Sequence, residues 1–169
     1  MTRWRIALVS VAVSALVSAP AAAADDFFGG QVKGQPKNFV MIDRGPRVIE
    51  QAVLTVDEKC ELNGKKTKPS GIASELKNAK VRKNKFEIDR VHEAPSTGLN
   101  PPEYGNSIHL RGQFLKDSAD VKIRAKDFDR HHGHLKCKSG KRTAKLDKVS
   151  RARYERALED EFPFFDPKP

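Results

Sequence analysis

Two stretches of strict apolar/polar alternation constrain the fold of this chain more than any other feature. Their apolar members are Ile108, Leu110, Gly112, Phe114, Ala119, Val121, Ile123 and Ala125, and nearly all the residues between them are polar or charged. A period of two places the apolar side chains on one face of a β-strand. Because residues 116–118 form a short polar connection between the stretches, we predict an antiparallel hairpin with one buried face and one charged face.

Further strand-like segments occupy most of the chain. Apolar residues of one parity run from Val48 to Leu62, with a break expected near Asp57, and Phe86 and Ile88 alternate with charged residues. Residues 39–42 are apolar on both faces. Short strands separated by Gly and Asn turns are typical of all-β domains. We therefore expect a mainly β protein, a small antiparallel sandwich or barrel over residues 25–148, with a C-terminal helix.

The helix is expected over residues 149–162. Ser150 is a favourable N-cap residue, and four apolar or aromatic residues follow at helical spacing: Tyr154, Ala157, Leu158 and Phe162. A single helix of this length needs to dock on the sheet to be stable. Residues 163–169 are rich in proline and are expected to form an extended tail.

Residues 1–24 have the composition of a signal peptide. Arg3 and Arg5 precede an apolar run over residues 6–17, and Ala22 and Ala24 suit signal peptidase. We expect cleavage after Ala24, and export to the periplasm or the extracellular space. An N-terminal membrane anchor is the alternative, but the run is short for a bilayer. No integral membrane span is expected in the mature chain.

The chain contains two cysteines, Cys60 and Cys137, both on the inward parity of strand-like segments. In an oxidising compartment an even pair favours a disulfide. We predict a Cys60–Cys137 bridge, with two free thiols as the alternative.

The chain is basic, with 32 Lys and Arg against 22 Asp and Glu and a formal net charge of +10. The outward positions of the predicted hairpin gather five of its basic or titratable side chains: His109, Arg111, Lys122, Arg124 and Lys126. Such a cluster attracts polyanions. We predict an anion-binding face whose partner is an anionic polymer or the cell-envelope surface. The alternative is a charged surface that only keeps the protein soluble.

A histidine-rich loop gives a second hypothesis. Imidazoles of His131, His132 and His134 are potential ligands of a divalent transition metal such as zinc or copper. Solvated histidines in a polar hairpin loop are the alternative, and no other cofactor is indicated.

Catalysis has weaker support than binding. The chain has no Gly-x-Ser-x-Gly motif and no phosphate-binding loop. We therefore expect an exported, non-catalytic binding domain, with a metal-binding protein or a small secreted hydrolase as alternatives. For the hydrolase no catalytic residue can be named.

The order of these features resembles a loose class of small exported bacterial proteins of unknown function. The resemblance rests on segments from residue 27 to 146: Phe27-Phe28-Gly29-Gly30, the strand before Cys60, Lys85–Ile88, Ile108–Phe114 and Cys137-Lys138-Ser139-Gly140. It implies a β-sandwich with one disulfide, and it implies no activity.

Overall fold

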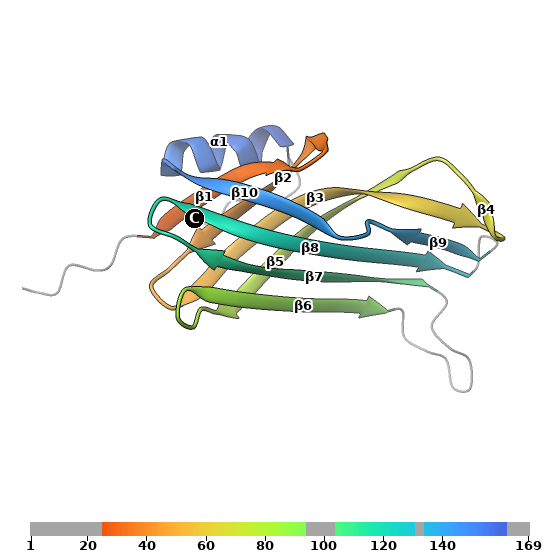
Figure 1. Ribbon diagram of the computed structural model, residues 1–169, viewed down its shortest axis with the longest axis horizontal. Helices are drawn as coiled ribbons and strands as arrows, with labels where there is room; N and C mark the ends of the chain where they lie inside the picture. The colour runs from red at the N-terminus through yellow and green to blue at the C-terminus, as the bar shows by residue number, and fades with distance from the viewer. Residues whose placement is uncertain (1–24, 94–103, 131–133, 162–169) are drawn as a thin grey trace, which may run out of the picture.

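Figure 1 shows the computed structural model, which describes residues 25–93, 104–130 and 134–161. The predicted fold class is confirmed, since the protein is a mainly β antiparallel barrel with one C-terminal helix. The elements in chain order are β1 (Asp26–Val32), β2 (Gln35–Arg44), β3 (Val48–Leu62), β4 (Lys65–Lys66), β5 (Ser70–Lys80), β6 (Lys85–Glu93), β7 (Tyr104–Phe114), β8 (Ser118–Asp129), β9 (Leu135–Lys138), β10 (Arg142–Val149) and α1 (Arg151–Glu161).

Six strands form a closed ring in the order β1-β2-β3-β9-β8-β10. The ring closes because β10 pairs with β8 along one edge and with β1 along the other. β5 adds to the free edge of β3, and β7 and β6 add to the free edge of β8. The predicted hairpin is therefore confirmed as β7 and β8.

β3 is continuous, so the break expected near Asp57 is wrong. One edge of β3 pairs with β2 up to Leu54 and with β9 from Lys59 onward. In the interval between them the side-chain amide of Gln35 pairs with the backbone of Asp57. Its Nε2 donates to the Asp57 carbonyl at 3.1 Å, and its Oε1 accepts from the Asp57 N–H at 3.2 Å. A side chain thus takes the place of a neighbouring strand and satisfies the backbone.

The interior of the barrel is filled by the inward residues of the alternating patterns. Phe28 from β1 and Phe114 from β7 are fully buried, with ring centroids 5.0 Å apart. Gly30 is required where β1 meets β10, because a Cβ there would lie 2.3 Å from the Lys145 carbonyl oxygen. The barrel therefore has a packed core.

The helix α1 covers the outer face of β1, β2 and β3 (Figure 1). Ser150 caps it as predicted, since its Oγ accepts from the Arg153 N–H at 3.3 Å. Tyr154 and Leu158 are buried against Met41 and Val53. This explains why residues 39–42 are apolar on both faces: one face meets the barrel interior and the other meets the helix.

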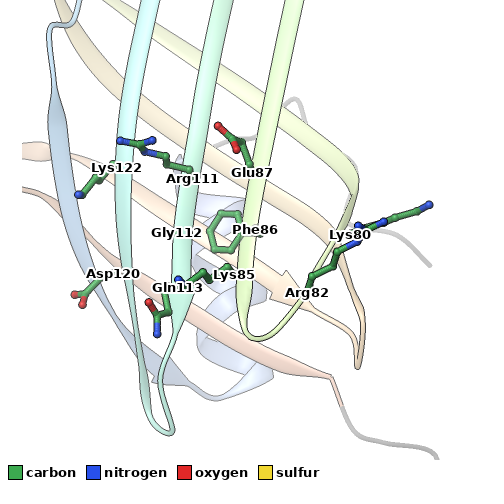
Figure 2. Close-up of a pocket in the computed structure, with 10 residues that line it drawn as sticks. All are labelled: Lys80, Arg82, Lys85, Phe86, Glu87, Arg111, Gly112, Gln113, Asp120 and Lys122. Atoms are coloured by element: carbon green, nitrogen blue, oxygen red, sulfur yellow. The ribbon is translucent and has the colours of Figure 1, made fainter.

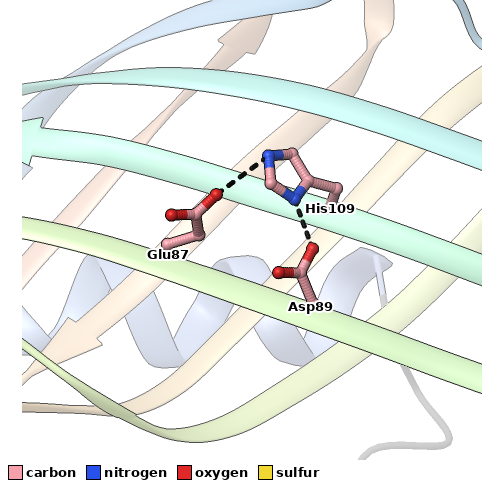
Figure 3. A group of neighbouring side chains, drawn as sticks. All are labelled: Glu87, Asp89 and His109. Atoms are coloured by element: carbon pink, nitrogen blue, oxygen red, sulfur yellow. Dashed lines mark hydrogen bonds and ion pairs between the residues drawn. The ribbon is translucent and has the colours of Figure 1, made fainter.

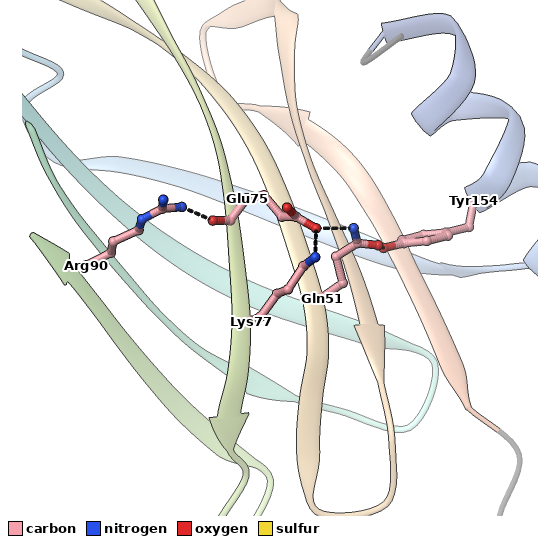
Figure 4. A network of polar contacts seen from close by, with 5 residues as sticks. All are labelled: Gln51, Glu75, Lys77, Arg90 and Tyr154. Atoms are coloured by element: carbon pink, nitrogen blue, oxygen red, sulfur yellow. Dashed lines mark hydrogen bonds and ion pairs between the residues drawn. The ribbon is translucent and has the colours of Figure 1, made fainter. Parts of the chain in front are cut away.

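A polar network connects this helix to β5 and β6 (Figure 4). The hydroxyl of Tyr154 donates to Oε1 of Gln51 at 3.0 Å, and Nε2 of Gln51 donates to Glu75 at 2.5 Å. Lys77 forms an ion pair with the same carboxylate. Arg90 of β6 donates to the Glu75 carbonyl across the interval where β5 and β6 are not paired as strands.

We expect Tyr154→Phe to lower the free energy of unfolding by about 1 kcal/mol, because it removes a half-buried hydrogen bond and leaves Gln51 without its donor. Burial, with the charges of Asp43 and Glu75, raises the pKa of Tyr154, so the hydroxyl remains a donor. Urea denaturation measures the change. Tyr104→Phe is the matched control, since Tyr104 is exposed, and an equal loss in both variants would contradict the role of the network.

The expected signal peptide, Phe162 and the tail 163–169 lie outside the described residues, so these assignments stay predictions. Among the residues that the structure describes, no helix has the length and apolar character needed to cross a membrane.

Candidate functional site

The predicted anion-binding residues lie on the outer face of β7 and β8, where the strand register aligns them. Arg111 lies directly opposite Lys122, and His109 lies opposite Arg124. Lys126 follows Arg124 on the same face of β8. Lys122 and Lys126 are four residues apart, which corresponds to about 13 Å along a strand. The cationic side chains thus form a line along β8.

One end of this line opens into a shallow hollow of about 690 Å³ over β6, β7 and β8 (Figure 2). Arg111 and Lys122 line it together with Lys80, Arg82 and Lys85. Glu87 and Asp120 are the two carboxylates in its lining. We call it the basic hollow, because its five cations exceed these two carboxylates and favour an anionic occupant.

The other end of the line continues across two more strands. Lys126 of β8 is the register partner of Lys138 of β9, and Lys138 is in turn the partner of Lys59 of β3. All three are exposed. Like charges directly opposite each other in a sheet repel and reduce stability. We call these three residues the lysine row.

A second hollow of about 410 Å³ adjoins the lysine row. Its charged lining residues are Lys59, Lys136, Lys138, Lys141, Arg142 and Glu61. The excess of cations there is greater than in the basic hollow. The described basic surface therefore extends beyond the hairpin of β7 and β8.

Lys59 is absent from the predicted anion-binding residues because apolar/polar alternation describes each strand in isolation. A signal was available in the cysteine pair. If Cys60 and Cys137 face each other in antiparallel strands, then residue 59 must face residue 138. The structure has this register, with the two Cα atoms 4.1 Å apart and the disulfide formed as predicted.

His109 has a different environment from the other predicted anion-binding residues. Its Nδ1 contacts Oδ1 of Asp89, and its Nε2 lies 3.4 Å from Oε1 of Glu87 (Figure 3). Both carboxylates come from β6, which pairs with β7. His109 therefore contacts two carboxylates, and it does not contribute to the anion-binding surface.

The histidine-rich loop is described only in part. His131 and His132 lie outside the described residues, and His134 is exposed next to β9. The metal site proposed for these three residues therefore stays a prediction.

A buried carboxyl group lies inside the barrel, two residues from the disulfide-bonded Cys60. Glu58 is 1% exposed, and its Oε1 has no hydrogen-bond partner. Burial, and secondarily the charge of Asp127, raises the pKa of Glu58 to about 7. Burial also raises the pKa of Asp127, although a hydrogen bond from the Phe128 N–H opposes this. Because Glu58 is buried, its ionisation is expected to change the free energy of unfolding.

Comparison of the chain with models of protein families, with curated proteins and with solved structures finds no match.

Proposed function

We propose that the protein is a non-catalytic binding domain for a linear polyanion, a polymer that carries repeated phosphate, sulfate or carboxylate groups. The observation that carries the proposal is the line of cations that runs from Arg111 and Lys122 through Arg124 to the lysine row. Three lysines on adjacent strands face one another, and this arrangement costs stability in the free protein. A bound anion relieves the repulsion, so the same arrangement favours binding.

The shape of the basic surface favours a polymer over a single small anion. Cations continue from the basic hollow along Lys122, Arg124 and Lys126 to the lysine row. A polymer that follows this line contacts several cations at once and releases a counterion at each contact. The large exposed apolar side chains of the described residues are Leu62, Val91, Tyr104 and Leu115, and none belongs to the line. This supports an electrostatic rather than an apolar partner.

The disulfide is compatible with an exported protein, since disulfides persist in oxidising compartments. We infer that the polyanion is met in the periplasm or outside the cell.

The test is binding to immobilised heparin and to polyphosphate at several salt concentrations. We expect the triple variant R111E/K122E/R124E to bind at least tenfold more weakly, and the slope of log K against log salt to become shallower as contacts with the anionic groups are lost. K37E/R153E/R156E is the matched control. It changes the net charge equally at exposed positions on β2 and α1, away from the line, and it should retain binding.

Equal losses in the two triple variants would show a dependence on net charge alone and would contradict the proposed surface. Binding of the unchanged protein that does not respond to salt would contradict it as well. The neutral variant R111Q/K122Q/R124Q repeats the test without adding acidic groups beside Glu87 and Asp120.

A further inference from the structure

The structure assigns a second kind of binding site to the same sheet. Glu87 and Asp89 are two residues apart on β6 and therefore project from the same face. His109 on β7 is the register partner of Asp89. The three side chains converge on the outer surface of the barrel, with the imidazole between the two carboxylates (Figure 3).

The distances suit the binding of one metal ion by all three side chains. One ligand atom from each residue can be chosen so that all three lie within 4.8 Å of one another. Around a tetrahedral zinc ion with bonds of about 2.1 Å, ligand atoms are about 3.4 Å apart. The carboxylates of Glu87 and Asp89 are 58% and 65% exposed, so their side chains can rotate. Because one ring nitrogen of His109 binds the ion, the ion replaces the contact between that nitrogen and its carboxylate.

The donor set selects the class of ion. One imidazole nitrogen and two carboxylate oxygens suit zinc and other divalent transition metals, whereas calcium and magnesium prefer an all-oxygen site. We propose that Glu87, Asp89 and His109 together bind a divalent transition-metal ion, with water in the remaining coordination positions. The proposal does not rest on polyanion binding, and it differs from the site expected at the histidine-rich loop.

The charges around the cluster affect its affinity for a metal ion. Arg111 lies opposite Glu87, and Arg124 lies opposite His109. Both are cations that repel a metal ion, and both also belong to the basic surface. Neutralising Arg124 removes a repulsion between this cation and the doubly charged ion across solvent-exposed surface, so metal binding should tighten severalfold at low salt. It should have the opposite effect on polyanion binding.

The experiment is calorimetric titration of the chelator-treated protein with zinc chloride, with a melting curve at each zinc concentration. We expect zinc to bind and to raise the melting temperature. His109→Gln and Asp89→Asn should each weaken binding by at least tenfold, and Arg124→Gln should tighten it. His92→Gln is the control, since His92 is an exposed histidine on the same strand as the two carboxylates, and it should bind as the unchanged protein does.

Three outcomes would overturn the proposal. The first is the absence of both heat and stabilisation on adding zinc, which would mean that the three residues form an ion pair only. The second is binding that His109→Gln leaves unchanged. The third is zinc binding that persists in His109→Gln but is lost when His132 and His134 are replaced, which would assign the metal to the histidine-rich loop.

Discussion

A double variant, C60A/C137A, is expected to lose about 4 kcal/mol of the free energy of unfolding. The bridge joins residues 77 positions apart, and closing a loop of that size restricts the unfolded chain by about this amount. The two sulfur atoms also lie in the core and connect β3 to β9, a strand of only four residues. Guanidinium denaturation of the variant and the unchanged protein measures the difference.

The unchanged protein after reduction is the control for the disulfide, because it keeps both cysteine side chains. Reduced protein and double variant should show similar midpoints, since the lost cross-link accounts for most of the effect. A double variant within about 1 kcal/mol of the oxidised protein would contradict a stabilising role for the bridge.

Glu58 should make the protein less stable as the pH rises. Its folded-state pKa of about 7 lies above the ordinary value of 4.5. Between these values the unfolded chain releases the proton and the native state keeps it, so unfolding becomes easier with rising pH. Over the whole interval the loss is about 3 kcal/mol, since each unit of pKa corresponds to about 1.4 kcal/mol. Below pH 4.5 both states are protonated, and above about 7 the loss is complete.

The measurement is urea denaturation of the unchanged protein and of Glu58→Gln at intervals from pH 4.5 to 8. Because the amide does not ionise, the stability of the variant relative to the unchanged protein should rise by about 3 kcal/mol across this interval. Asp57→Asn is the control, an exposed carboxylate next to Glu58 on the same strand. Parallel stability curves for Glu58→Gln and the unchanged protein would contradict the burial of an ionisable group at this position.

The periodic patterns were sufficient to predict the fold class, the β7–β8 hairpin and the cap at Ser150, because each depends on neighbours in sequence. The strand over residues 26–32 was not predicted. Its two glycines normally disfavour a strand, and the need for Gly30 arises only from the closely packed β10. The continuity of β3 at Asp57 likewise depends on Gln35, which lies 22 residues away.

The candidate site was predicted in part for the same reason. Side-chain parity identified the outward cations of β7 and β8, and the register confirms that Arg111 and Lys122 are neighbours. Side-chain parity does not show which other strands lie next to β7 and β8. The carboxylates next to His109 come from β6, and Lys59 comes from β3, so both depend on pairing that alternation alone does not specify.

The pairing of β1 with β10 sets the order in which this protein can fold. Phe27 is the register partner of Val149, so the first described strand pairs with a segment 122 positions further along the chain. Until β10 has docked, β1 presents an open edge, and the ring of six strands cannot close. Pairing between distant segments is slow to form and leaves such edges exposed to other chains in the meantime. The unfolded chain is therefore expected to be prone to aggregation until β10 has paired with β1.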